Sequence, residues 1–213
     1  MVRGAPVLMV DTDLDRVELA LCAGELACPR CGGVLGPWGS ARGRWLRGRG
    51  GLQQRLRPRR GRCRDRACRA THVLLPTVGL LRRVDLAEVI GAALLARARQ
   101  ASHRQIAAWL GVPLSTVRGW LGRMAERVEL VRAHFTRLAV WLDPSADAPK
   151  PRGSPLGDAV EAIGVAAVAA ARRFGSRGPA SPWRLAAGAT GGRLLAPLTL
   201  QTSNTSSLFP APW

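Results

Sequence analysis

Two close pairs of cysteines restrict what the first third of this chain can fold into. Cys28 and Cys31 are separated by two residues and Cys63 and Cys68 by four, and the pairs flank a glycine-rich turn at 48–51. Thiolates on tight turns bind a metal ion tetrahedrally, and two such pairs around a β-hairpin are typical of a zinc ribbon. The pattern therefore predicts a Zn2+ site with four cysteine ligands. In so small a unit, metal binding would supply most of the folding free energy.

Two alternatives for these cysteines stay open. His72 lies four residues after Cys68 and could replace one thiolate as a ligand. The cysteines could instead be buried without any metal. The fifth cysteine, Cys22, precedes the first pair on an expected helix, and we interpret it as a core residue that does not bind the metal.

The segment from Cys28 to His72 also carries two-thirds of the formal net charge of +18. It contains 13 arginines and one acid, Asp65, which gives +12 over 45 residues. Unbalanced charge destabilises a small fold unless an acidic partner neutralises it, and nucleic acid is the obvious partner. We therefore interpret the segment as a phosphate-binding surface, with a merely solvated charged face as the alternative.

The chain shows no apolar run of about 20 residues, so we expect no transmembrane span and no membrane partner. The apolar stretch at 5–10 is too short for a signal peptide. These observations predict a soluble, cytoplasmic protein associated with the nucleoid. In that reducing compartment, cysteines are more often metal ligands than disulfide partners.

Residues 105–121 contain the most specific motif of the chain, a helix-turn-helix. Ala107 provides the small residue where the two helices touch, and Gly111 provides a residue that tolerates positive φ at the turn. Ser102 with Gln105 is a capping box for the first helix, and Ser115 is a candidate N-cap for the second. The apolar positions that pack the two helices are Ile106, Leu110, Val112, Val117 and Trp120.

The second helix of such a motif lies in the major groove of double-stranded DNA. The residues that we expect to contact DNA are Arg104, Ser115, Thr116, Arg118, Gly119 and Arg123. Arg118 is the best candidate for reading guanine, because its guanidinium matches the O6 and N7 acceptors. Arg104 suits a backbone phosphate, and a capping role competes with base contact at Ser115.

A heptad stripe follows the motif and predicts one helix of about 28 residues. Its apolar positions are Val117, Leu121, Met124, Val128, Val131, Phe135, Leu138 and Leu142. The stripe could pack against other helices of the same chain, or it could form the coiled coil of a homodimer. Both interpretations stay open.

These patterns together predict an α+β fold. Residues 1–76 form the zinc ribbon with a short strand at 6–10 and a helix capped by Asp13, and residues 77–142 form the helix-turn-helix domain, starting with a helix capped by Asp85. Residues 143–157 are a linker. Residues 158–213 form an alanine-rich helix to about Phe174, followed by an irregular tail.

The order of these parts resembles a family of bacterial zinc-ribbon/helix-turn-helix proteins to which no activity is assigned. The resemblance rests on the segments at 27–33, 57–63, 71–76 and 85–121. The chain is also similar to the N-terminal DNA-binding part of some insertion-sequence transposases, in which a second knuckle with four intervening residues is common. This similarity implies DNA binding and mobile-element ancestry.

The acids after residue 121 lie on expected helices and a linker, so we expect no catalytic carboxylate triad and no enzyme activity. The leading hypothesis is a zinc-dependent DNA-binding protein, either a transcriptional regulator or a transposase-associated module without a catalytic domain. The alternative is a zinc-ribbon module that binds nucleic acid without sequence preference or recruits a protein.

Overall fold

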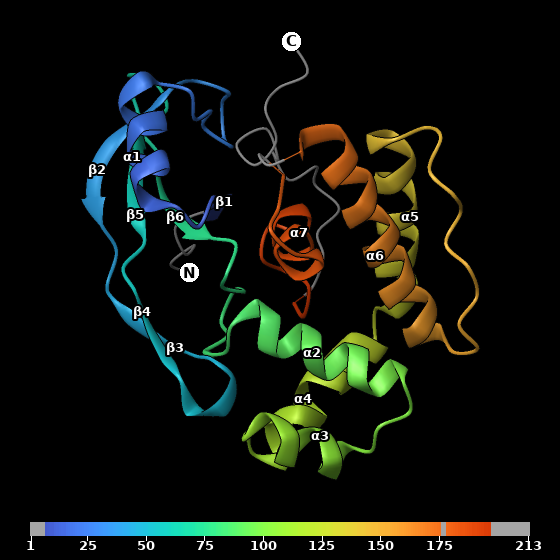
Figure 1. Cartoon of the computed structure of the whole chain (residues 1–213). Helices are drawn as coiled ribbons and strands as arrows, with labels where there is room; N and C mark the ends of the chain where they lie inside the picture. Colours follow the sequence, from blue (N-terminus) through green and yellow to red (C-terminus); the bar gives the residue numbers. More distant parts are fainter. Residues whose placement is uncertain (1–6, 176–177, 197–213) are drawn as a thin grey trace.

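The computed structural model describes residues 7–175 and 178–196, which form an N-terminal β-sheet region followed by helices (Figure 1). We call residues 7–76 the β half and the described residues from 77 onward the helical half. The mixed α+β class predicted from the sequence is confirmed.

The β half contains two sheets and one helix. A four-stranded sheet has the order β1-β6-β5-β2, in which β1 and β6 are parallel and the other neighbours are antiparallel. A separate hairpin of β3 and β4 turns through a short 3-10 segment at Arg49–Gly51, as the glycines predicted. The elements are β1 (Val7–Val10), α1 (Leu14–Ala23), β2 (Leu35–Ser40), β3 (Arg44–Arg47), β4 (Gln53–Leu56), β5 (Arg59–Cys63) and β6 (Thr71–Pro76).

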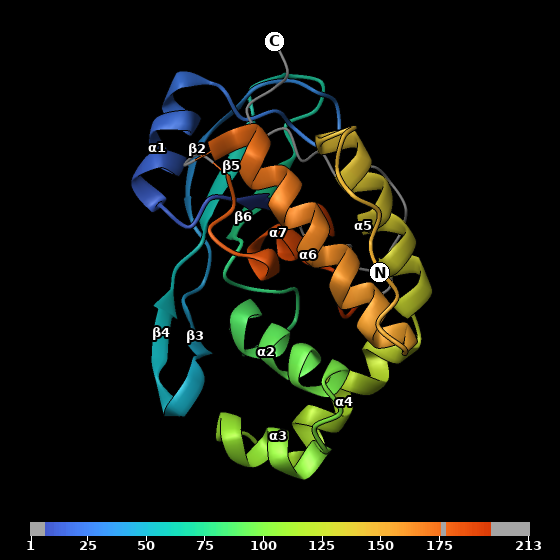
Figure 2. The same cartoon turned by 45° about the vertical axis from the view of Figure 1, so that its right-hand side comes forward.

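Alternation along the strands gives the sheet two buried faces. Leu8 and Leu74 belong to a small apolar cluster with α1, whereas their neighbours Met9 and Leu75 belong to the large core shared with the helical half. Successive strand residues point to opposite faces, so the sheet lies between α1 and α7, as Figure 2 shows. Helix α1 therefore covers the outer face of the sheet and closes a small apolar core there.

The helical half consists of α2 (Ala87–Ala98), α3 (His103–Leu110), α4 (Leu114–Ala125), α5 (Val128–Leu142), α6 (Pro155–Phe174) and α7 (Pro182–Ala189). Figure 2 shows α5 and α6 side by side. Fully buried alanines of α6, such as Ala162 and Ala166, leave room for larger side chains of α5, such as Phe135. Burial of such side chains is the main source of stability in this half.

The heptad stripe does not lie on one helix. Helix α4 ends at Ala125 and α5 starts at Val128, with Arg127 between them at φ −138° and ψ 13°. Residues Met124, Val131 and Phe135 of the stripe are nonetheless fully buried inside this chain. A homodimer would therefore need another surface.

Four smaller expectations from the sequence are also wrong. Asp85 does not cap α2: Leu86 holds the N-cap position, and the Asp85 carboxylate pairs with Arg47. Cys22 is exposed, since it lies on the outer side of α1. The alanine-rich helix begins at Pro155, where Ser154 caps it. The segment expected as a tail contains α7, and residues 197–213 of that tail lie outside the described residues.

Candidate metal centre and nucleic-acid interface

The four paired cysteines come together at one end of the sheet. Their sulfur atoms all lie within 4.8 Å of one another, although Cys28 and Cys68 are 40 residues apart. The Cys28 and Cys68 sulfurs are 3.8 Å apart and those of Cys31 and Cys63 are 3.5 Å apart. Such a cluster of four soft donors could hold a metal ion.

Backbone geometry around the first knuckle makes room for these sulfurs. The Cys28 amide donates to the Gly33 carbonyl at 2.6 Å, and the Gly32 amide donates to the Cys28 carbonyl at 2.8 Å. Gly32 has a φ of 75°, which favours glycine. A Cβ at Gly33 would lie 3.3 Å from the sulfurs of both Cys31 and Cys63. The glycine pair therefore closes the turn without filling the space between the thiols.

The chemistry of the donor set also fits a cation. The Gly33 amide lowers the pKa of the Cys31 thiol, but the neighbouring thiols of Cys68 and Cys63, together with burial, raise it to about 12. Thiolates this close repel one another, so Cys31 retains its proton unless a cation neutralises the group. A bound metal ion displaces those protons and removes the repulsion.

His72 does not join the group of four sulfurs but lies beside it. Its side chain is fully buried on β6, and its Nε2 atom is 3.2 Å from the Cys28 sulfur. A ring N–H in this position can donate a hydrogen bond to a thiolate that ligates a metal. The sequence predicted His72 only as a replacement ligand and missed this supporting position.

The helix-turn-helix motif folds as its local signals predicted. Ser102 and Gln105 form a capping box at the start of α3, and Gly111 ends α3 with a φ of 67°. The packing residues Ile106, Ala107, Leu110, Val117 and Trp120 are all buried. Helices α3 and α4 therefore form a rigid unit that presents the outer face of α4.

The expected DNA-contacting residues occupy that outer face and the start of α3. Arg104, Ser115, Arg118 and Arg123 are exposed, and Thr116 and Gly119 are partly exposed. Pro113 holds the N-cap position of α4, so the expected capping role of Ser115 is wrong and its hydroxyl remains available. Arg123 folds back, because its guanidinium donates to the Gly119 carbonyl at 2.7 Å.

The β3–β4 hairpin docks against the helix-turn-helix unit. The Arg47 guanidinium donates to both oxygens of the buried Asp85 carboxylate, at 2.9 and 3.3 Å. At the tip of the hairpin, the Arg49 guanidinium stacks on the Trp109 ring of α3 at 4.2 Å. Trp109 lies two residues before the Gly111 turn, so the hairpin tip lies close to the turn that leads into α4 (Figures 1 and 2). Neither pair had a sequence signal, since their partners are far apart in the chain.

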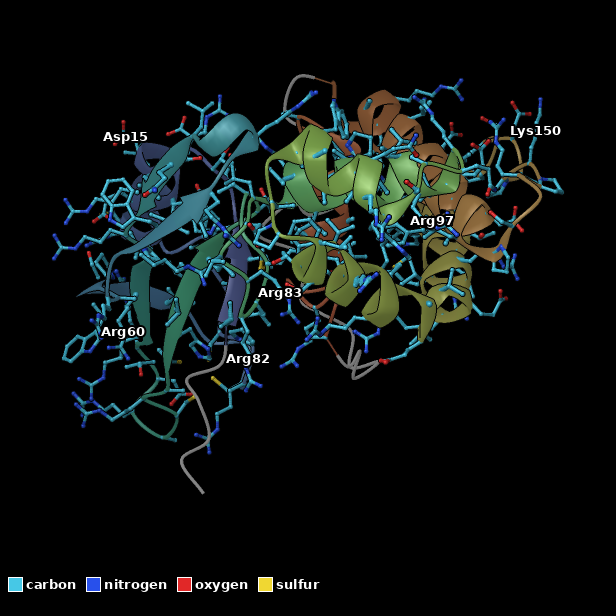
Figure 3. The ribbon with its side chains drawn as sticks, turned by 90° about the horizontal axis from the view of Figure 1, so that it is seen from below. Asp15, Arg60, Arg82, Arg83, Arg97 and Lys150 are labelled. Atoms are coloured by element: carbon cyan, nitrogen blue, oxygen red, sulfur yellow. The ribbon has the colours of Figure 1, made fainter. Side chains whose placement is uncertain are left out.

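The basic segment keeps most of its charge unpaired. Of its 13 arginines, Arg47 and Arg59 have a carboxylate within 4.0 Å among the described residues. Figure 3 shows Arg60 on the β half and Arg97 and Lys150 on the helical half, and it shows Arg82 and Arg83 of the helical half close to the β half. Most of the 13 arginines are also exposed, whereas Arg44 and Arg60 have buried guanidinium nitrogens, so much of the positive charge of the β half faces solvent.

Comparison with known proteins supports the assignment of the helical unit. Residues 85–132, which span α2, α3, α4 and the start of α5, match the family model of a homeodomain-like domain. Domains of this kind bind DNA through the third helix, which corresponds to α4 here. No curated protein and no solved structure matches the chain significantly. Within the described residues, no helix is long and apolar enough to cross a membrane.

Proposed function

We propose that this protein binds double-stranded DNA and recognises a specific sequence through α4. The observation that carries the proposal is the geometry of α3, the Gly111 turn and α4, together with the homeodomain-like match over the same residues. Helix α4 would enter the major groove with its first two turns facing the bases.

Within α4, Arg118 is the residue proposed to read a base. Its side chain is exposed and has no carboxylate within 4.0 Å among the described residues, so it is available for bidentate contact with guanine. Ser115, Thr116 and Gly119 lie near Arg118 on α4. Their short side chains, and the lack of one at Gly119, would let the helix approach the bases closely. Arg104, at the start of α3, and Arg123, held along α4, suit backbone phosphates.

The cysteine cluster is proposed as a structural zinc site. Cys28, Cys31, Cys63 and Cys68 would hold the ion, and His72 would support the Cys28 thiolate. Four thiolates leave no open position on a tetrahedral ion, so the metal would hold the two knuckles together and perform no chemistry on a substrate.

Arginines near the tip of the β3–β4 hairpin are proposed to bind phosphates of the duplex. The hairpin tip lies beside the turn before α4, so Arg49 and Arg55 can contact the backbone next to the groove that α4 occupies. Such contacts carry no sequence information but raise affinity, and they make binding depend steeply on salt.

In the cell, a protein with these parts would act on the nucleoid as a transcriptional regulator or as a DNA-binding module associated with a transposase. A second candidate is a nucleic-acid-binding module without base readout. The concentration of unpaired arginine in the β half, rather than on α4, favours this second candidate.

Selection of binding sites from random duplex DNA separates the two candidates. We expect the native chain to enrich one motif and the Arg118→Ala chain to lose preference at one position of it. Arg137→Ala, at an exposed arginine of α5 outside the motif, is the matched control and should recover the native motif. Recovery of no motif by the native chain would overturn sequence-specific binding.

A further inference from the structure

A basic pocket lies beside the metal centre, on the outer edge of the sheet. It has a volume of about 750 Å³, and its principal lining residues are Pro37, Trp38, Arg62, Arg64, Arg66 and Arg69. Strand β2 forms one wall, and the end of β5 with the loop of the second knuckle forms the other. Cys63 of the metal cluster also lines the pocket. The duplex contacts proposed above, at α4 and at the tip of the hairpin, use neither Trp38 nor the four lining arginines.

The backbone of β2 turns Trp38 outward. The register between β2 and β5 is irregular between Pro37 and Ser40, and Gly39 within that interval has a φ of 80°. A bulge of this kind redirects a side chain out of the regular ladder. Trp38 is consequently 50% exposed at the edge of the sheet, where a ligand can reach its ring.

An arginine covers only part of this ring. The Arg62 guanidinium lies 4.3 Å from the centre of the Trp38 ring, in cation–π contact. This contact fixes the orientation of the indole before any ligand arrives. The exposed remainder of the ring and of the guanidinium provides flat surface on which another planar group can stack.

The charges around the ring are positive and unpaired. None of the four lining arginines has a carboxylate within 4.0 Å among the described residues. The nearby Asp65 uses its carboxylate within the knuckle, where it accepts from the Ala67 amide at 2.8 Å. A Cβ at Gly36 would lie 2.8 Å from the Arg64 Nε atom, so the glycine allows Arg64 to lie flat over the strand.

We propose that this pocket binds an unpaired nucleotide of single-stranded nucleic acid. The base stacks on Trp38, and the flanking phosphates contact Arg64, Arg66 and Arg69. A base inside a duplex cannot stack on a side chain, because its faces are covered by neighbouring base pairs. An aromatic platform within a cationic pocket is the combination that binds single strands without sequence preference.

The position of the pocket makes it independent of α4. Figures 1 and 2 show the knuckle loops at the top of the β half, whereas α3 and α4 lie at the bottom of the molecule. The proposal therefore goes beyond the proposed duplex binding and does not rest on it. The chain would hold a duplex at one end and an unpaired strand at the other.

Fluorescence anisotropy with labelled 12-nucleotide oligothymidine and oligouridine tests the proposal on the full chain. We expect Trp38→Ala to weaken binding of at least one of these strands about tenfold. Trp38→Phe, which keeps an aromatic ring, should retain most of the affinity. The two strands distinguish DNA from RNA as the source of the nucleotide.

Trp141→Ala is the matched control, because Trp141 on α5 is 51% exposed and carries a stacked arginine, Arg173, at 4.9 Å. It should bind both strands as the native chain does. Affinity of Trp38→Ala for a random duplex should also stay within twofold of native. Native-like binding of both strands by Trp38→Ala, or an equal loss on strands and duplex, would overturn the proposal. Far-UV circular dichroism checks that each variant is folded.

Discussion

The two halves of this molecule are stabilised in different ways. The helical half shares one large apolar core, in which side chains such as Phe135 and Ile163 are fully buried. On its outer side the β half has only a small cluster with α1, and two of the buried side chains in that cluster are Cys28 and Cys63. Apolar burial can stabilise the helical half and the inner face of the sheet that packs against it. The knuckles of the β half need another source of free energy.

The same contrast holds for charge. The 45 residues with a charge of +12 lie in the half with the thinner core, where mutual repulsion of arginines is the most costly. A metal ion held by the four thiolates would offset this cost locally, and the phosphate backbone of a bound nucleic acid would offset it over the wider surface. We infer that the arginines of the β half lower its stability but raise the affinity for nucleic acid. The core of the helical half keeps the geometry of α4 fixed.

Loss of the proposed metal site should have the largest effect on stability, and that effect should be confined to the β half. A Cys28→Ser and Cys31→Ser double variant removes half of the ligands, and zinc binding by such sites contributes about 10 kcal/mol. We expect hydrogen exchange to show lost protection around the knuckles and in β5 and β6, while α2 to α6 stay protected.

Cys22→Ser is the control for this experiment, because Cys22 is exposed and lies outside the cluster. It should keep the native metal content and the native exchange pattern. Native protection of the β half in the double variant, with no metal bound, would contradict the account. Simultaneous unfolding of both halves would contradict it as well.

Weakening the junction between the halves should produce a smaller effect. Asp85 is buried, and its only ion pair among the described residues is with Arg47 of the hairpin. Asp85→Asn removes the charge that Arg47 contacts, which should cost about 1–3 kcal/mol in the free energy of unfolding. Thermal unfolding should then separate into two transitions.

Glu129→Gln tests whether any lost ion pair has this effect. Glu129 pairs with Arg132 on the surface of α5, and solvent screens an exposed pair of this kind, so it contributes little to the free energy of unfolding. Its unfolding should remain a single transition. An equal effect of both substitutions would show that Asp85 has no special role at the junction.

Lowering the pH should have the smallest effect on stability, and the part of it that comes from His134 should be confined to the helical half. Burial lowers the pKa of His134 on α5, and a nearby Arg137 lowers it further. The unfolded chain therefore binds the proton more readily, so the stability that the neutral ring contributes is lost as the pH falls below about 6.5. Partial exposure of the ring keeps this effect small.

The loss of stability that comes from protonation of His134 can be measured by comparing melting temperatures at pH 7.5 and 5.5. The native chain should lose more stability over this interval than His134→Gln, which cannot bind the proton. Carboxylates titrate in both proteins, so only the difference between them reports on His134. An equal loss in the two proteins would assign the acid sensitivity to other groups.

Local signals allowed the sequence to predict a large part of this structure. Spacing alone predicted that Cys28 and Cys68 belong to one site, and the residue types at Ser102 and Gly111 predicted the start and end of α3. These signals work because knuckles, caps and tight turns depend on a few neighbouring residues.

The features that the sequence failed to predict depend mostly on contacts between residues far apart in the chain. The pairing of Asp85 with Arg47 outcompeted a capping role that looked equally good from the sequence. The break after Ala125 contains no proline or glycine, so the heptad stripe continued across it without a signal. Ser181 followed by proline does mark the start of α7 and could have been recognised as an N-cap.

The central claim is that the arginines of the β half provide affinity for DNA and that α4 recognises its sequence. A set of dissociation constants tests this claim most directly. The native and Arg118→Ala chains are measured on the selected site and on a scrambled duplex, each at low and high salt. We predict that Arg118→Ala loses at least fivefold on the site and almost nothing on the scrambled duplex, with an unchanged salt dependence there. An equal loss on both duplexes would show that α4 supplies only charge, and would contradict the account.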